Sequence, residues 1–330
     1  MNASRPVLAV LDVLPDTSRT ALAESFPGHD LVHVTESTED ERRRVIADAE
    51  AALVMWSAVE ASVFEAARHC RVVQKLGVGV DKIDLDAASR CGIPVLRAAG
   101  INADAVAEMT LLLILAVARD LGRAVDETRR GGFPKEEVRA RAFQLTGKTA
   151  GLVGFGHIGR AVARRLAAFG VTVLYHDVVR ASADDERACG VTYAELGDLT
   201  ARSDIVSLHL PATADNRGLV GPAFLAGMKQ GAMLVNTARG TLVDDEALAA
   251  AIASGHLLGA GLDVTSVEPL PRTSPLWDLE RVVVTPHIGG AVANNFPRVA
   301  ERAARNVSAV LAGRRADVAP ADVASWPLPS

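Results

Sequence analysis

The stretch 149–177 constrains the fold of this chain more than any other part of the sequence. It begins with an apolar run, continues into the pattern Gly154-x-Gly156-x-x-Gly159, and then shows apolar residues at helical spacing. A run rich in β-branched and aromatic residues follows at once and ends in Asp177. Strand, tight turn, helix and a second strand that ends in an acid predict the βαβ unit of a doubly wound α/β fold.

Each glycine of the pattern has its own physical reason. Gly154 allows the turn, Gly156 lets the backbone approach a pyrophosphate, and Gly159 lets the helix pack closely on the strand. The N–H groups of His157 and Ile158 lie at the positive end of the helix dipole, so they can bind phosphate oxygens without a cationic side chain. An ordinary βα turn is the alternative, but the flanking strands, the helix and the acid favour a dinucleotide site.

Asp177 predicts which dinucleotide is bound. A carboxylate at the end of the second strand accepts hydrogen bonds from the adenosine ribose hydroxyls and would repel a 2′-phosphate. The sequence therefore predicts NAD rather than NADP as the cofactor. Arg180 lies nearby in the sequence and weakly favours NADP.

Length and composition exclude several classes of protein. A chain of 330 residues suits two α/β domains, and a net charge of −5 does not indicate a surface for nucleic acid or anionic lipid. The three cysteines, Cys70, Cys91 and Cys189, show no metal-binding spacing and fit reduced thiols in the cytoplasm. The apolar run 7–11 is interrupted by Asp12 and is followed by no small-residue cleavage site, so a strand is expected there and not a signal peptide. The run 109–117 is too short for a membrane span. We expect a soluble cytoplasmic protein without a bound metal or a membrane or nucleic-acid partner.

The first hundred residues alternate short strands with helical patterns, which predicts a parallel sheet covered by helices on both faces. The segment 76–84 follows one of these strands and contains two glycines. Ligands collect at the carboxyl ends of such strands, and the backbone N–H groups around Val78 and Gly79 could bind a small carboxylate. A plain turn from strand to helix explains the segment equally well.

The parts between and after the two predicted sheets carry weaker patterns. A long helix is expected from Asn102 to about Gly122, bridging the two domains. The charged segment 123–148 is expected to be an arm or linker in which 131–134 interrupts any helix. The tail from Ala316 is expected to lie along the surface or to fray.

In the second half, the predicted strands end in polar or reactive residues. Arg239, Asp263 and His287 each follow such a strand. The carboxyl ends of parallel strands border one crevice, so these three side chains are expected to converge where the nicotinamide lies.

The chemistry of these residues suits reduction of a 2-keto acid. An arginine can hold a carboxylate and polarise the adjacent carbonyl, and a histidine can protonate the new alkoxide, so Arg239 and His287 fit these roles. Glu268 could hydrogen-bond the other imidazole nitrogen, select the tautomer and favour the protonated ring. The alternatives are a surface salt bridge for Arg239, a structural histidine for His287, and a solvated loop carboxylate for Glu268.

The residues discussed above lie in sequence motifs by which the chain resembles the D-isomer-specific 2-hydroxyacid dehydrogenase family. The resemblance covers nearly the whole length of the chain. The resemblance rests on six motifs in the family's order: Leu76-Gly-Val-Gly-Val-Asp81, Gly154-Phe-Gly-His-Ile-Gly159, His209-Leu-Pro-Ala-Thr213, Asn236-Thr-Ala-Arg-Gly240, Gly261-Leu-Asp-Val264 with Glu268-Pro269, and Thr285-Pro-His-Ile-Gly289.

The resemblance implies roles for individual residues. The catalytic set is Arg239, Glu268 and His287. The loop with Val78 and Gly79 grips the substrate carboxylate, and Asn102 lies near the substrate. The remaining implied cofactor contacts are Pro211 and Thr213 by the adenosine, Ala238 and Asp263 at the nicotinamide carboxamide, and Thr237 and Gly290.

The resemblance also implies the domain organisation. Both domains are doubly wound with parallel sheets, and a Rossmann NAD domain at about 100–289 is inserted into a flavodoxin-like substrate domain of 1–99 plus 290–330. Members of the family are usually homodimers joined through the NAD domain and the arm.

Departures from the family's patterns narrow the substrate. Phosphoglycerate dehydrogenases carry an arginine before a serine in the loop after the third strand, where this chain has Trp56 before Ser57, and phosphite dehydrogenases carry a lysine where it has Val78. Small acids such as glyoxylate or hydroxypyruvate are therefore expected, with Trp56 and Phe296 as pocket walls. The alternatives are phosphoglycerate dehydrogenase, an NAD-sensing corepressor of the same fold, and a degenerate enzyme that serves as a structural dimer.

Overall fold

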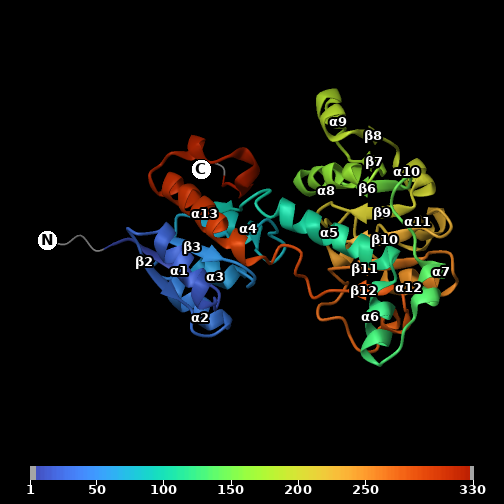
Figure 1. The fold of residues 1–330 in the computed structure, drawn as a ribbon. Helices are drawn as coiled ribbons and strands as arrows, with labels where there is room; N and C mark the ends of the chain where they lie inside the picture. Colours follow the sequence, from blue (N-terminus) through green and yellow to red (C-terminus); the bar gives the residue numbers. More distant parts are fainter. Residues whose placement is uncertain (1–4, 328–330) are drawn as a thin grey trace. The chain divides into compact units, whose positions relative to one another are not determined.

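The computed structural model describes residues 5–327 and divides into two compact units (Figure 1). Unit 1 comprises Met1–Asn102 with Val292–Ser330, and unit 2 comprises Ala103–Ala291. Each unit contains one sheet with helices on both faces. The predicted α/β class with two doubly wound domains is confirmed.

Unit 1 is built on a six-stranded sheet in the order β2-β1-β3-β4-β5-β13, in which only β13 is antiparallel to its neighbour. The first five strands have the flavodoxin-like order. The strands are β1 (Val7–Val10), β2 (Asp30–His33), β3 (Ala51–Val54), β4 (Val73–Lys75), β5 (Val95–Leu96) and β13 (Val323–Ser325).

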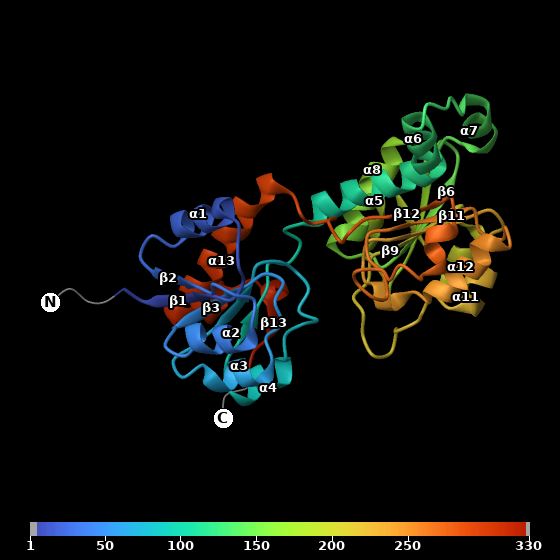
Figure 2. The same cartoon turned by 90° about the horizontal axis from the view of Figure 1, so that it is seen from below.

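Helices cover both faces of this sheet (Figure 2). On one face α1 (Asp16–Ser25) lies beside α13 (Phe296–Leu311), which contacts β4 and whose apolar stripe belongs to the same buried cluster as residues of β1 and β3. The other face is covered by α2 (Glu39–Ile46), α3 (Ala61–Ala66) and α4 (Leu85–Arg90). Because β1 and β3 are buried on both faces, they are almost entirely apolar, as expected for parallel strands.

Unit 2 is built on a seven-stranded parallel sheet in the order β8-β7-β6-β9-β10-β11-β12. This is the Rossmann order with one further strand, and the direction of winding reverses between β6 and β9. The strands are β6 (Thr149–Val153), β7 (Thr172–His176), β8 (Val191–Tyr193), β9 (Ile205–Leu208), β10 (Met233–Asn236), β11 (Gly259–Leu262) and β12 (Val282–Val284).

The helices of unit 2 also form two layers. One contains α5 (Ala103–Ala118) and α8 (His157–Ala168), which pack against each other and the sheet. The opposite layer contains α10 (Leu196–Arg202), α11 (Pro222–Gly227) and α12 (Asp245–Ala253), and α9 (Ala183–Cys189) lies beside β8. Within the described residues, no helix is both long and apolar enough to cross a membrane.

The helix expected from Asn102 to Gly122 is interrupted, so its predicted length is wrong. It begins at Ala103 and ends at Ala118, because Asp120 has a left-handed backbone with φ 51°. The Asp120 carboxylate is buried, 3.3 Å from the Arg141 guanidinium and 3.7 Å from that of Arg281. These ion pairs fix the turn, and a propensity pattern cannot show them.

The arm that follows contains two helices, α6 (Leu121–Arg129) and α7 (Lys135–Arg141). The predicted break at 131–134 separates them. Arg281 Nη2 donates to the Arg141 carbonyl oxygen at 2.6 Å, which ties the end of α7 to the residue before β12.

The tail was expected to lie along the surface or to fray, and that expectation is wrong for its central part. Residues 323–325 form β13, which pairs with β5 and completes the sheet of unit 1. An antiparallel edge strand is stabilised by a partner that is distant in sequence, so the local composition of the tail does not predict it.

Candidate active site

The glycine turn after β6 has the geometry that its pattern predicts. Gly154 has φ 99°, and a Cβ there would lie 2.6 Å from the backbone of His209. A Cβ on Gly159 would lie 2.4 Å from the carbonyl oxygen of Gly154, so the close approach of α8 requires glycine. A Cβ on Gly156 would meet no atom within 4 Å, which leaves room for a ligand against the backbone.

The residues that follow β9 pack against this turn. Burial lowers the pKa of His209 to about 3, so its imidazole is neutral, and Nε2 lies 2.9 Å from the Ser207 hydroxyl. The backbone N–H of His209 donates to the Val153 carbonyl at 2.7 Å. The His209 side chain next to the glycine turn is therefore uncharged.

Asp177 is attached to the same turn. Its Oδ2 accepts a hydrogen bond from the Phe155 N–H at 2.7 Å, so the acid lies beside the glycine pattern. Arg180 is held by Glu186 through two hydrogen bonds of 2.9 and 3.2 Å. This pairing lowers the pKa of the Glu186 carboxyl. Because Arg180 is directed to that carboxylate, it does not favour binding of the 2′-phosphate of NADP.

At the end of β10, the side chain of Asn236 shapes the turn that presents Arg239. Its Oδ1 accepts from the Ala238 N–H at 3.0 Å, and its Nδ2 donates to the Arg239 carbonyl at 2.9 Å. Asn236 is completely buried. It therefore fixes both ends of the turn, a role that the sequence reasoning did not assign.

At the end of β11, Asp263 is 2 % exposed and holds the loop that carries His287. Its carboxylate accepts hydrogen bonds from the Thr285 hydroxyl at 2.6 Å, the Ile288 N–H at 2.9 Å and the Gly289 N–H at 2.7 Å. The resemblance implied a nicotinamide contact for Asp263, and that contact stays a prediction. What the structure adds is a positioning function for the same carboxylate.

His287 has a left-handed backbone with φ 54°. Such a conformation costs a residue with a Cβ about 1–2 kcal/mol, so it persists only where the surroundings impose it. Here the His287 N–H donates to the Asp263 carbonyl at 2.8 Å, and Asp263 holds the residues on both sides. The direction of the imidazole is therefore set by the end of β11.

The predicted hydrogen bond between His287 and Glu268 is present. His287 Nδ1 lies 2.9 Å from Glu268 Oε2, with both side chains about half exposed. An ionised carboxylate can only accept, so Nδ1 carries a proton and Nε2 is the atom that can exchange one with a substrate.

Arg239, Asp263 and His287 follow three adjacent strands, β10, β11 and β12, as predicted. A Cβ on Gly240 would overlap the carbonyl oxygen of Thr265, so the turn after Arg239 packs directly on the segment after Asp263. Arg239 is half-buried, and its Nη1 donates to the Ala238 carbonyl at 2.7 Å.

The other predicted cofactor residues lie in loops at the ends of β9, β10 and β12. The loop with Pro211 and Thr213 is closed by Asn216, which accepts from the Thr213 N–H at 2.7 Å and donates to the Pro211 carbonyl at 2.8 Å. The Thr237 hydroxyl lies 2.9 Å from that of Thr110 in α5. Ala238 is buried and Gly290 is exposed.

The predicted carboxylate loop follows β4 in unit 1. Within the described part of the chain, no hydrogen-bond acceptor is found for the N–H groups of Val78 and Gly79. The Oδ1 atom of Asn102 is shielded from solvent and is likewise unpaired among residues 5–327. Unit 1 therefore presents donors and an acceptor that a small polar ligand could satisfy.

The loop with Trp56 is held by a buried acid that the sequence reasoning missed. Asp12 accepts hydrogen bonds from the backbone N–H groups of Met55, Trp56 (3.1 Å) and Ser57 (2.8 Å), and is itself completely buried. Trp56 is 45 % exposed, so its ring is free to line a pocket. Phe296, the other expected wall, is partly buried against the core of unit 1.

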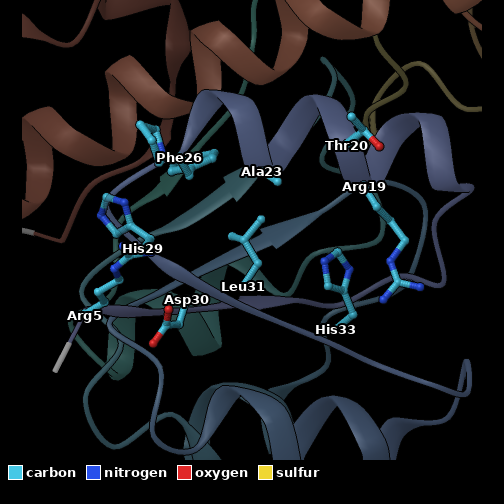
Figure 3. A pocket seen from close by; sticks show the side chains of 10 residues that line it. Arg5, Arg19, Thr20, Ala23, Phe26, His29, Asp30, Leu31 and His33 are labelled. Carbon is cyan, nitrogen blue, oxygen red and sulfur yellow. The ribbon is translucent and has the colours of Figure 1, made fainter.

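Figure 3 shows a hollow between α1 and β2, lined among others by Arg19, Leu31 and His33. None of the predicted site residues lines it. Within the described residues, no group of three or more histidine, cysteine or acidic side chains could hold a metal ion.

Known proteins resemble this chain in sequence and in fold. Residues 111–289 match the family model described as "D-isomer specific 2-hydroxyacid dehydrogenase, NAD binding domain". The chain is 39 % identical over 316 residues to a glyoxylate reductase from Thermofilum pendens, covering 94 % of this chain and 93 % of that one. The chain belongs to the D-isomer specific 2-hydroxyacid dehydrogenase family. It is accordingly an NAD-dependent oxidoreductase that acts on 2-hydroxy and 2-keto acids.

Other members of the family show the same likeness. A hydroxypyruvate reductase from Thermotoga maritima is 39 % identical over 266 residues, covering 79 % of this chain and 84 % of that one. D-3-phosphoglycerate dehydrogenase from Mycobacterium tuberculosis is 38 % identical over 311 residues, but the chain spans 58 % of its length. The structure of D-lactate dehydrogenase from Aquifex aeolicus, complexed with NAD and lactic acid, superposes with a TM-score of 0.83 at 28 % identity, covering 98 % of this chain and all of that one.

Two glycine substitutions test the turn. Gly159→Ala should lower the free energy of unfolding by about 1–3 kcal/mol, because the new methyl group overlaps the Gly154 carbonyl. Gly156→Ala should change it by less than about 0.5 kcal/mol, because no atom lies near the methyl group. It should nevertheless weaken NADH binding by roughly tenfold, or about 1.4 kcal/mol. Urea unfolding and NADH fluorescence measure both effects, and equal stabilities for the two variants would contradict the assigned roles.

Proposed function

We propose that this family member reduces a small unphosphorylated 2-keto acid, such as glyoxylate or hydroxypyruvate, to its D-2-hydroxy acid. The observation that carries the proposal is the hydrogen bond between His287 Nδ1 and Glu268, because it leaves Nε2 as the proton donor. The names of the relatives from Thermofilum pendens and Thermotoga maritima support the same substrates.

Arg239, Glu268 and His287 are the proposed catalytic set. Arg239 binds the substrate carboxylate and polarises the adjacent carbonyl, since a guanidinium presents paired donors to such a group. His287 Nε2 donates a proton to the carbonyl oxygen, and Glu268 stabilises the imidazolium before the transfer. In the reverse reaction the same nitrogen accepts the hydroxyl proton.

The described residues fit an NAD molecule. When bound, NADH supplies the hydride. The open space at Gly156 and the first-turn N–H groups of His157 and Ile158 would hold the pyrophosphate, and Asp177 the adenosine ribose. From the family resemblance we assign the remaining contacts to Pro211, Thr213, Thr237, Ala238, Asp263 and Gly290.

Unit 1 is the proposed substrate domain, and unit 2 the NAD domain. The unpaired N–H groups of Val78 and Gly79 would bind the carboxylate, and Asn102 Oδ1 would accept a hydrogen bond from the hydroxyl of the 2-hydroxy acid. Trp56 would line the pocket on the side where phosphoglycerate enzymes carry an arginine. A buried phosphate requires a paired cation, so this loop favours unphosphorylated substrates.

We also infer a cytoplasmic homodimer. The basis for the homodimer is the family resemblance, together with apolar side chains left exposed in unit 2, such as Leu112 (53 %) and Phe133 (84 %). The basis for the cytoplasm is the three cysteines, whose spacing fits reduced thiols. A net charge of −5 offers no basis for binding nucleic acid or anionic membranes. A corepressor function is less supported, because the relatives named above are reductases and dehydrogenases.

The first test removes the proposed proton donor. His287→Gln should reduce kcat by about a hundredfold or more and leave the Kd for NADH unchanged, because only proton transfer is lost. His256→Gln is the matched control, since the two ring nitrogens of His256 lie 3.2 Å from the Gln230 side-chain oxygen and 2.9 Å from the Leu225 carbonyl oxygen, at no residue of the proposed site. Normal turnover in His287→Gln would refute the catalytic assignment.

The second test concerns the carboxylate beside the histidine. Glu268→Gln replaces a carboxylate that only accepts, 2.9 Å from Nδ1, with an amide that can also donate, so a proton on Nδ1 is no longer required. Because Nε2 is then a less consistent proton donor, kcat should fall by roughly tenfold while the Kd for NADH stays unchanged. Steady-state kinetics measure this, with the exposed Glu246→Gln as control. An unchanged kcat would exclude the pairing from catalysis.

The third test concerns phosphate. Glyoxylate or hydroxypyruvate should show a kcat/KM at least roughly tenfold above that of 3-phosphohydroxypyruvate, which corresponds to about 1.4 kcal/mol. Trp56→Arg should narrow this difference, and Trp277→Arg, at a half-exposed position in unit 2, should not. A wild-type preference for the phosphorylated acid would instead favour a phosphoglycerate dehydrogenase.

A further inference from the structure

Asp322 in the C-terminal segment is only 1 % exposed and lies at the centre of a polar network in unit 1. Its Oδ1 accepts a hydrogen bond from the backbone N–H of Ala99 at 2.8 Å. Its Oδ2 accepts from Arg302 Nη1 at 2.9 Å and from Asn306 Nδ2 at 3.2 Å, both on α13. The buried charge is thus paired with a cation and bonded at both oxygens.

The backbone around Asp322 holds the same segment. The Arg97 N–H donates to the Asp322 carbonyl at 2.8 Å, and Arg97 Nε donates to the Ala321 carbonyl at 3.0 Å. Together with the pairing of β13 and β5, these bonds fix residues 97–99 against the C-terminal segment.

Residues 97–99 connect in turn to the carboxylate loop. The Ala98 N–H donates to the Gly77 carbonyl at 2.8 Å, one residue before the unpaired N–H of Val78. Asn306 Nδ2 also lies 3.1 Å from Gln74 Oε1, in the strand that leads into this loop. The chain continues from Ala99 to Asn102, whose Oδ1 is unpaired.

These contacts connect the buried Asp322 carboxylate to two groups that are proposed to bind the substrate, the Val78–Gly79 loop and Asn102. Burying a charge is costly unless it is fully hydrogen-bonded, and removing one partner leaves the others unsatisfied. Binding groups retain their geometry only when the residues behind them are fixed, and losing such a supporting contact typically weakens ligand binding by one or two orders of magnitude in metal sites.

We propose that Asp322 is a positioning residue for the substrate. It fixes residues 97–99, and through them the Val78–Gly79 loop, whose N–H groups are proposed to bind the 2-keto acid carboxylate, and the start of the segment with Asn102. The inference rests on the proposed function and extends it, because it makes the C-terminal segment part of the substrate site.

The test separates substrate binding from cofactor binding. Asp322→Asn should raise the KM for glyoxylate by about tenfold, because the amide NH₂ opposes the Arg302 and Asn306 donors and displaces the segment. The KM for NADH and the kcat at saturating glyoxylate should change by less than about twofold, because the contacts proposed for NAD and for proton transfer lie in unit 2. Asp317→Asn is the matched control, since Asp317 forms an exposed pair with Arg314 in the same segment.

A second variant covers the case in which Asp322→Asn does not fold. Arg302→Gln keeps the Ala99 bond but removes the cation, and should raise the KM for glyoxylate by a smaller factor in the same direction. An unchanged KM for glyoxylate, or a parallel loss of kcat and NADH binding, would overturn the inference. A wild-type enzyme that reduces none of the 2-keto acids would overturn the proposed function instead.

Discussion

The hydrogen bonds accepted by the Asp263 carboxylate are the interaction on which the candidate site depends most. They fix Thr285, Ile288 and Gly289 around a histidine whose left-handed backbone is unfavourable on its own. A Cβ on Gly289 would lie 2.8 Å from Asp263 Oδ2, so the close approach also explains that glycine. The direction of the His287 imidazole follows from a buried acid one strand away, and Glu268 then determines which nitrogen is free.

A buried carboxylate also holds a loop or segment at two places in unit 1. Asp12 holds the loop with Trp56, and Asp322 holds the segment that supports the Val78–Gly79 loop. Both carboxylates are at most 1 % exposed; Asp12 binds three backbone N–H groups, and Asp322 binds one together with two side-chain donors. A short loop has few apolar side chains to fix it, so a buried carboxylate that binds several N–H groups is an effective anchor. In unit 1, the loops that carry the proposed substrate contacts are positioned by two acids to which no contact with the substrate is assigned.

The two units contain different groups that the proposed reduction of a keto acid requires. In unit 2, a helix N-terminus and an open glycine turn suit a dinucleotide, and the ends of β10 and β12 carry Arg239 and His287, the proposed cation and proton donor. In unit 1, unpaired N–H groups suit a small carboxylate, and the Asn102 amide oxygen suits a hydroxyl donor. Under the proposed function, unit 1 contributes substrate contacts only, and unit 2 contributes the cofactor contacts and the proton donor.

The sequence by itself determined the α/β class and the glycine turn, and it predicted the acid proposed to favour NAD and the proposed catalytic set Arg239, Glu268 and His287. These features depend on local patterns, because a turn, a helix start and a strand end each need particular residue types at fixed spacing. Only the tertiary structure decided the break at Asp120, the pairing of β13 and the anchoring functions of Asp12, Asp263 and Asp322. Each of these depends on partners distant in sequence, and an isolated aspartate shows no sign of whether it will be buried and bonded or solvated at the surface.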